Sequence, residues 1–182
     1  MKIQEHAARV IVIFFKEPLK FVLASLIAMV VSACSLGILA PVMWLGMGEM
    51  FKKMRAGAEA TYSDLFIHLD KAVMLAVLGF IVVVCVSIGS ILIIPGIIIG
   101  ALFMYSLYYM AYKGTGLMDS LKYSSLTVNK TNLMTNIVIT LAVWLIMSTG
   151  FSIFIGAFIT YPLCAGFMAF MFEEVKETND LV

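Results

Sequence analysis

The sequence predicts an all-α membrane protein with six transmembrane helices arranged as three helical hairpins. Three observations predict this fold: few charged residues, long charge-free runs, and the clustering of basic residues between those runs. Only 13% of the 182 residues are charged, whereas soluble domains carry about 25%. The composition therefore indicates a chain that lies mostly in lipid.

The charge-free runs indicate where the chain crosses the membrane. Residues 21–48, 72–112 and 131–172 contain no Asp, Glu, Lys or Arg, and they are 28, 41 and 42 residues long. One helical span needs about 20 apolar residues, so the second and third runs each fit two spans. The first run is long for one span and short for two, and its length alone does not decide between them.

The basic residues decide in favour of six spans. If every run is a hairpin, all 12 Lys and Arg residues of the chain lie on the same side of the membrane. If the first run crosses once, four basic residues face eight across the membrane. Because basic residues concentrate on the cytoplasmic side, we expect both termini in the cytoplasm. The expected spans are 20–36, 38–54, 71–92, 95–112, 132–149 and 152–172.

The segments outside the spans are expected at the membrane surface. Residues 1–18 combine apolar residues with a charged strip and end at Pro18, which predicts an N-terminal interfacial amphipathic helix. Residues 19–175 form a single transmembrane domain with hairpins at 20–54, 71–112 and 132–172. Short amphipathic connectors are expected at 61–70 and 119–128, and 176–182 form a cytoplasmic tail. No cleavable signal peptide is expected.

Glycine and proline residues lie near the middle of each run and predict the hairpin turns. Proline is well placed in the first turn of a helix, so each of these prolines is expected to open the second helix of its hairpin. The similar order of the residues in the three runs has two explanations, a threefold duplication or shared membrane constraints. The predicted turn residues are Gly37, Pro41, Gly89, Pro95, Gly156 and Pro162.

The fifth span carries the strongest polar feature. Asn129, Asn132, Asn136 and Thr140 are spaced so that one unbroken helix would place them on one face. Such a face has two interpretations, hydrogen bonding between helices or the wall of a polar groove or narrow pore. We favour the first.

Small and aromatic residues suggest how the helices pack. The pairs Gly96–Gly100 and Ala165–Ala169 have the small-xxx-small spacing that allows helices to approach closely. Their partner is either internal or another subunit. The tyrosines of the fourth span are expected in an interfacial aromatic belt, with ligand binding as the alternative; they are Tyr105, Tyr108, Tyr109 and Tyr112. Glu49 is expected to pair with Lys53 near the headgroups.

Several chemistries lack the residues that they need. The centres of the predicted spans hold no ionisable residue, and His6 and His68 are isolated in the sequence. Cys34, Cys85 and Cys164 lie in apolar segments without metal-ligand spacing. No catalytic constellation or nucleotide-binding motif is present. We therefore expect no enzyme activity, no cofactor, no metal and no nucleic-acid partner.

Several short motifs together resemble a known group of proteins. They are Pro41…Gly46…Phe51, Tyr62–Phe66, Leu92–Gly96 and Asp119…Asn129-Lys130. The pattern is similar to six-span bacterial proteins that include the YciC-like inner-membrane proteins, the DUF975- and DUF4013-type families and the membrane domain attached to some glycerophosphodiester phosphodiesterases. The resemblance implies a six-helix fold in a bacterial or archaeal plasma membrane. It implies no reaction and no catalytic residue.

The function expected from these observations is non-catalytic. We expect an integral membrane scaffold or accessory subunit, acting in envelope or lipid homeostasis and contacting membrane lipids. It would act alone, as a homo-oligomer or with another membrane protein. Two alternatives stay open. One is a small oligomeric channel lined by the Asn/Thr face of the fifth span. The other is a lipid-binding or lipid-moving protein that uses the grooves between the hairpins and the basic cytoplasmic rim of Lys52, Lys53 and Arg55.

Overall fold

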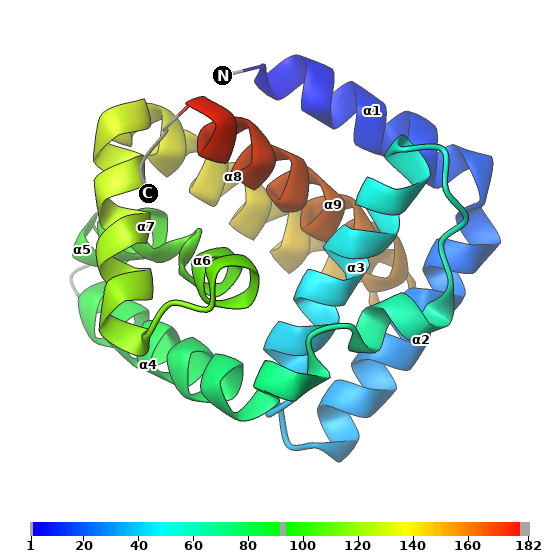
Figure 1. The fold of residues 1–182 in the computed structure, drawn as a ribbon, viewed down its shortest axis with the longest axis horizontal. Coiled ribbons are helices and arrows are strands. Elements are labelled where there is room, and N and C mark those ends of the chain that lie inside the picture. The colour runs from blue at the N-terminus through cyan, green and yellow to red at the C-terminus, as the bar shows by residue number, and fades with distance from the viewer. Residues whose placement is uncertain (1, 92–93, 179–182) are drawn as a thin grey trace.

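The computed structural model describes residues 2–91 and 94–178, and all regular elements in those ranges are helices (Figure 1). The last four residues of the predicted tail lie outside the described residues. The elements are α1 (Ile3–Lys16), α2 (Pro18–Cys34), α3 (Ala40–Arg55), the 3-10 helices η1 (Tyr62–Phe66) and η2 (Leu69–Lys71), α4 (Ala72–Ser90), α5 (Ile94–Phe103), α6 (Ser106–Lys113), α7 (Leu117–Thr131), α8 (Leu133–Ser152) and α9 (Phe154–Thr178).

Four helical stretches of the described chain are long and apolar enough to cross a membrane. They are Tyr62–Ser90, Ile94–Lys113, Leu133–Ser152 and Ile155–Lys176. The apolar helix α2 is shorter, with 17 residues, and α3 carries basic residues in its last turn. The all-helical class and a membrane-compatible composition are therefore present, whereas six crossings stay a prediction.

Helix α3 is the central element of the molecule. It packs against α1, α2, α4, α6, α9 and η1, and Figure 1 shows it between α2 and α9. Met43, Leu45, Met47, Met50 and Phe51 have no exposed surface. Because protein surrounds α3, its polar end needs no contact with hydrocarbon. This explains why α3 is less apolar than an isolated membrane span.

Close approach to α3 depends on small residues. A Cβ added at Gly46 would lie 2.3 Å from the backbone oxygen of Leu65 in η1. A Cβ at Gly48 would lie 2.8 Å from Cβ of Ala169 in α9, and one at Gly166 would lie 2.6 Å from the Phe51 ring. Larger side chains at these positions would separate the helices, so these contacts set the distance between α3 and its neighbours.

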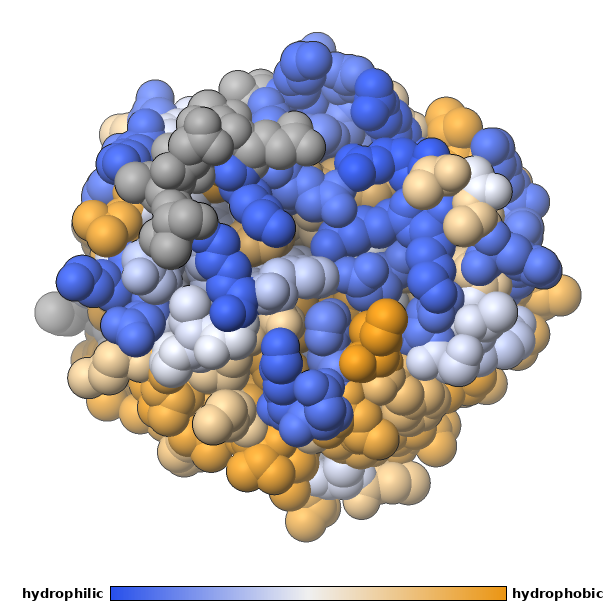
Figure 2. Space-filling model, viewed as in Figure 1, coloured by the Kyte–Doolittle hydropathy of each residue, from blue (hydrophilic) through white to orange (hydrophobic). Residues whose placement is uncertain are grey.

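The outer surfaces of α4 and α8 are apolar. Of the 18 consecutive residues that are most apolar in the stretch that contains α4, only 17% are buried, and 22% of the corresponding 18 residues in α8 are buried. Phe80 of α4 and Leu145 of α8 are among the exposed large side chains. Figure 2 shows hydrophilic residues over the upper and central part of one face, with hydrophobic residues along its lower rim. The exposed apolar surface fits contact with lipid rather than with water.

The three predicted hairpins correspond to packed helix pairs: α2 with α3, α4 with α5, and α8 with α9. In the first, Gly37 turns the chain with φ of +85°, and Pro41 lies in the first turn of α3. In the second, a Cβ at Gly89 would lie 2.9 Å from the backbone of Gly96, and Pro95 is the second residue of α5.

The third turn differs from the prediction. The chain turns at Ile153, where α8 ends, and α9 starts at Phe154. Gly156 and Pro162 therefore lie inside α9, and Pro162 does not open that helix. A proline removes one backbone hydrogen bond from a helix, and neighbouring helices can compensate for this in a membrane protein. The position of a proline alone was therefore insufficient to place this turn.

The predicted fourth span is interrupted. Instead of one helix over 95–112, α5 ends at Phe103 and α6 begins at Ser106. Ser124 of α7 bonds to the backbone on both sides of the interruption: its hydroxyl donates to Leu102 O (2.6 Å) and accepts from Tyr105 N (3.2 Å). The predicted connector at 119–128 is thus part of α7, which packs against α5 and α6.

Helix α1 occupies the predicted N-terminal segment and lies alongside α9. Val10, Ile13 and Phe14 are buried, whereas Val12 and Phe15 are exposed. Its amphipathic character fits a helix that packs on the protein with one side and meets the membrane surface with the other.

Candidate functional site: an apolar cavity and a polar pocket

A cavity of about 790 Å³ lies between α3, α4, α5, α6 and α8, with one residue of α9 at its edge. We call it the apolar cavity. Most of its wall is hydrocarbon, and its polar groups are few. The lining residues include Pro41, Trp44, Gly79, Phe80, Val83, Ser87, Gly100, Met104, Ser106, Leu107, Thr140, Trp144 and Met168.

Two glycines position the helices around the apolar cavity. A Cβ at Gly79 would lie 3.0 Å from Cγ of Pro41, so α4 meets α3 closely at this point. A Cβ at Gly100 would lie 3.3 Å from the ring of Trp144, so α5 meets α8 closely. The helices are in contact at Gly79 and Gly100, and the apolar cavity lies between these two contacts.

The apolar cavity opens onto the apolar surface of the molecule. Leu36, Phe80 and Trp144 line it and are 92%, 70% and 41% exposed. Leu36 belongs to the turn between α2 and α3, which carries no charge. A hydrocarbon chain could therefore enter the cavity from the side, without crossing a charged layer.

A second, smaller space lies at the charged end of the molecule. This polar pocket has a volume of about 380 Å³, and its lining residues are Glu49, Lys52, Lys53, Ala56, Tyr112, Phe172, Glu173 and Lys176. The Lys52 ammonium lies 3.0 Å from Glu49, 3.6 Å from Glu173 and 3.7 Å from the centre of the Tyr112 ring. The pocket thus offers both charges and an aromatic face.

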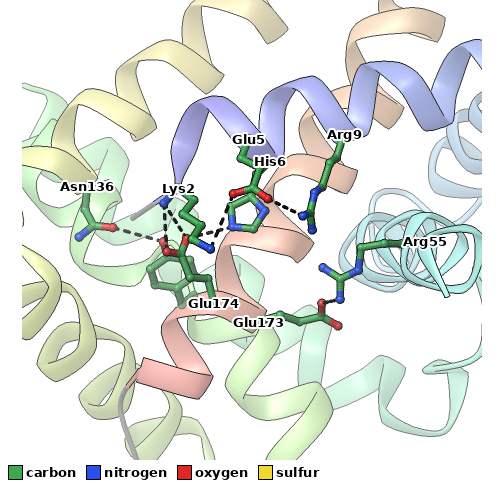
Figure 3. Close-up of polar contacts among 9 residues, drawn as sticks. Lys2, Glu5, His6, Arg9, Arg55, Asn136, Glu173 and Glu174 are labelled. Carbon is green, nitrogen blue, oxygen red and sulfur yellow. Dashed lines mark hydrogen bonds and ion pairs between the residues drawn. The ribbon is translucent and has the colours of Figure 1, made fainter.

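Ion pairs hold the walls of the polar pocket together. Arg55 of α3 pairs with Glu173 of α9 (Figure 3). Lys53 pairs with Asp64 of η1 at 2.5 Å, and Asp64 also accepts a bond from the backbone of Thr61 in a capping box. The predicted Glu49–Lys53 pair is therefore wrong, because Glu49 pairs with Lys52 and Lys53 pairs with the buried Asp64.

The four tyrosines of α6 and the preceding turn form no aromatic belt at the lipid surface. Tyr105, Tyr108 and Tyr109 are almost fully buried. Each hydroxyl has a partner from another helix. The pairs are Tyr105 with Asn136 (3.2 Å), Tyr108 with Trp44 (3.1 Å), Tyr109 with Thr127 (2.6 Å) and Tyr112 with Glu49. The interruption after α5 turns α6 into the interior, and this change of direction is absent from the local sequence pattern.

The predicted Asn/Thr face is not continuous. Asn132 lies between α7 and α8 with φ of +90°, and its side chain accepts a bond from Met134 N as the cap of α8. Asn129 belongs to α7 and is exposed, bonding to the backbone of its own helix. Only Asn136 and Thr140 share a helix. The prediction assumed an unbroken helix, which Asn132 interrupts.

Asn136 is fully buried, and both the oxygen and the nitrogen of its side-chain amide form hydrogen bonds. Its Oδ1 accepts from Tyr105, and its Nδ2 donates to Thr131 Oγ1 and to Asn132 O, both at 3.0 Å. Thr140 bonds back to Asn136 O at 2.9 Å and lines the apolar cavity. These contacts join α8 to α7 and to the turn before α6.

The small-residue pairs have partners within the chain. Gly96 contacts Ser90 at the end of α4, and Gly100 contacts α8. Ala165 and Ala169 are buried, and both lie against Gly48 of α3. The two glycines of one motif thus pack against different helices.

Glu174 fixes α1 to the end of α9. Figure 3 shows its carboxylate directed toward Lys2 and His6 of α1. The backbone N–H of Lys2 donates to it at 3.0 Å, and Nε2 of His6 lies 2.9 Å from it. The N-terminal helix is therefore anchored by polar as well as apolar contacts.

Among the described residues, no group of three or more His, Cys, Asp or Glu side chains is placed to hold a metal ion. No protein-family model, curated protein or solved structure matches this chain. The resemblance to six-span bacterial membrane proteins accordingly stays a prediction.

The Trp44–Tyr108 contact and the residues that line the two spaces were not predicted from the sequence. Trp44 and Tyr108 lie 64 positions apart and meet only because α6 turns inward. The cavity itself depends on gaps between five helices, and no local pattern encodes such a gap.

Proposed function

We propose that this chain is a six-span integral membrane protein that binds the hydrocarbon chain of a membrane lipid in the apolar cavity. It acts without catalysis, as a lipid-binding component of a bacterial or archaeal plasma membrane with both termini in the cytoplasm. The expected scaffold or accessory role, and a role in envelope or lipid homeostasis, are compatible with such binding.

The apolar cavity is the observation that carries this proposal. Its volume of about 790 Å³ falls within the range of about 300–1,000 Å³ that is typical of ligand pockets. Its walls are mostly hydrocarbon, and its rim lies on the apolar surface. Inside a bilayer, the compounds that reach such a space are apolar chains, since they surround it at high concentration.

The arrangement of charges supports the six crossings in this proposal. The turns around Gly37 and Ile153 carry no charged residue, whereas the opposite end holds the charged ends of α3 and α9. The 17 residues of α2 and 16 of α3 give lengths of about 24–26 Å. Helices of this length suit a locally thinned bilayer.

The channel alternative receives less support from these contacts. Asn136 is fully buried and all its hydrogen bonds end on protein groups, whereas Asn129 and Asn132 lie outside the same helical face. A water path would need exposed polar groups on a shared wall. Helix-to-helix bonding explains Asn136 without any lumen.

Filling the cavity tests the proposal. Ala76 of α4 lines the cavity, while the next residue, Val77, is absent from the lining and 44% exposed. Ala76→Phe should reduce retained lipid by about tenfold in native mass spectrometry, because the new ring occupies the space of the chain. Val77→Phe on the outer surface should leave the bound lipid unchanged. Equal lipid retention in wild type and Ala76→Phe would contradict the proposal.

A further inference from the structure

The apolar cavity and the polar pocket are lined by three of the same helices, α3, α6 and α9. On α3 the cavity residue Trp44 is followed five positions later by the pocket residue Glu49. On α6 the corresponding residues are Leu107 and Tyr112, and on α9 they are Met168 and Phe172. At a rise of about 1.5 Å per residue, the cavity residue and the pocket residue of each helix are about 6–8 Å apart along the helix axis.

On α6 the buried Tyr108 lies between the cavity residue Leu107 and the pocket residue Tyr112. The hydroxyl of Tyr108 accepts a hydrogen bond from Nε1 of Trp44, which lines the cavity, at 3.1 Å. Its ring stacks on Phe172 at 5.1 Å and on Tyr112 at 6.3 Å, and both of these line the pocket. Tyr108 thus touches the wall of each space.

Tyr108 is carried by a short element with irregular backbone at both ends. Helix α6 has eight residues, is separated from α5 by the turn at Met104 and Tyr105, and ends at Gly114 with φ of +64°. A half-helix bounded in this way, within a membrane domain, is the kind of element found at the binding sites of transporters.

The two spaces together match one class of ligand. The cavity is lined by hydrocarbon and begins at the charge-free turn near Leu36, while the pocket presents the lysines Lys52 and Lys176 beside the acids Glu49 and Glu173. A hydrocarbon chain suits the first. A headgroup with both a phosphate and an ammonium suits the second, since each of its charges finds an opposite charge there.

We propose that the apolar cavity and the polar pocket form one passage for a zwitterionic lipid between the two membrane leaflets, closed at Tyr108. This proposal rests on the proposed function and adds movement of the lipid to its binding. The headgroup passes this point when the Tyr108 ring moves away from Trp44 and Phe172. The passage requires no covalent step.

Lipid movement in proteoliposomes tests the proposal. The probe is phosphatidylethanolamine with a fluorophore on its acyl chain, and its transfer between leaflets is followed by quenching from outside with dithionite. Tyr108→Ala opens the passage and should raise the transfer rate at least about tenfold over wild type. Tyr123→Ala, the same change at a tyrosine of α7 that lines neither space, should leave the rate at the wild-type value.

A double variant separates a true passage from a leaky, misfolded protein. Ala76→Phe fills the cavity, so Tyr108→Ala combined with Ala76→Phe should return the rate to the wild-type value. Tyr108→Ala combined with Val77→Phe should keep the raised rate, because Val77 is not in the lining. An unchanged rate in Tyr108→Ala, or a raised rate that persists when the cavity is filled, would overturn the passage.

Failure of the lipid passage can be distinguished from failure of lipid binding. If wild-type protein retains lipid in native mass spectrometry and Tyr108→Ala does not speed transfer, the binding function stands and the passage is wrong. If wild type retains no lipid and Ala76→Phe changes nothing, the binding function itself is wrong.

Discussion

Asn136 joins three elements through a single side chain. It receives a hydrogen bond from Tyr105 and donates to Thr131 and to the backbone of Asn132. Because the side chain has no exposed surface, water cannot replace a lost partner. Asn136 is therefore a structural residue in this account, and its amide holds α8 against the turn that directs α6 inward.

Replacing Asn136 should destabilise the protein. Asn136→Leu leaves the Tyr105 hydroxyl without its acceptor, and we expect the free energy of unfolding to fall by about 1–2 kcal/mol. Asn129→Leu is the matched control: Asn129 is exposed and bonds only within its own helix, so the change should stay within about 0.5 kcal/mol. Thermal unfolding in detergent measures both. Equal losses in the two variants would contradict the structural role of Asn136.

The sequence indicated which individual residues are polar and buried better than it indicated which residues they contact. It placed Asn129, Asn132, Asn136 and Thr140 on one polar face, and only Asn136 and Thr140 are buried on the same helix. It assigned Lys53 to Glu49 and the tyrosines to an interfacial aromatic belt. Both interpretations were wrong, because the partners Asp64, Trp44 and Thr127 come from elements distant in the sequence.

The interruption between α5 and α6 is the element that shapes the site. It frees backbone groups at Leu102 and Tyr105, and Ser124 of α7 bonds to both. Without this support, free backbone groups in a membrane domain would be costly. Helix α7 thus stabilises the inward course of α6 and, through it, the position of Tyr108.

Removing the Ser124 hydroxyl should weaken the interruption. Ser124→Ala leaves the Leu102 carbonyl and the Tyr105 N–H without this partner, so we expect a loss of about 1–3 kcal/mol and faster amide exchange at residues 104–106. Ser125→Ala is the control, because the Ser125 hydroxyl donates to the Lys122 carbonyl within its own helix. Hydrogen exchange in micelles compares the two variants. Equal protection of residues 104–106 in both would rule out this role of Ser124.

Elements that follow from local rules were predicted, and elements that depend on tertiary contacts were not. Pro41 after Gly37 placed the first turn correctly, since a positive φ and a proline at a helix start are local properties. The third turn was misplaced because Pro162 is tolerated inside α9. The break before Ser106 was also missed, since it depends on Ser124 from another helix.

At the scale of the whole molecule, the charges and the apolar surface divide the protein into zones. The charged residues Lys52, Arg55 and Glu173 lie around the polar pocket, whereas α4 and α8 present apolar side chains outward. The low proportion of charged residues, 13%, predicted apolar outer helices, and the clustering of basic residues between the charge-free runs predicted that the charges gather at one end. The cavity was not predictable, because it results from how five helices meet.

The proposed binding and passage of a lipid depend on the orientation of the α2–α3 hairpin. If the hairpin crosses the membrane twice, the apolar cavity begins at the leaflet opposite the polar pocket, and a lipid in the cavity lies between the two. If residues 21–48 cross once, Lys52 and the basic residues that follow it lie on the opposite side of the membrane from the N-terminus. The side of the membrane on which the turn at residues 35–39 lies therefore decides whether the cavity and the pocket face opposite leaflets.

Cysteine labelling of that turn is the most direct test. In a variant with Cys34, Cys85 and Cys164 replaced by alanine, one cysteine is placed at Ile38 in the turn or at Ala58 after α3, both exposed. A membrane-impermeant maleimide is then applied to membranes of each orientation. We expect Ile38→Cys to react only from the extracytoplasmic side and Ala58→Cys only from the cytoplasmic side. Labelling of Ala58→Cys from the extracytoplasmic side, or of both positions from one side, would contradict this expectation.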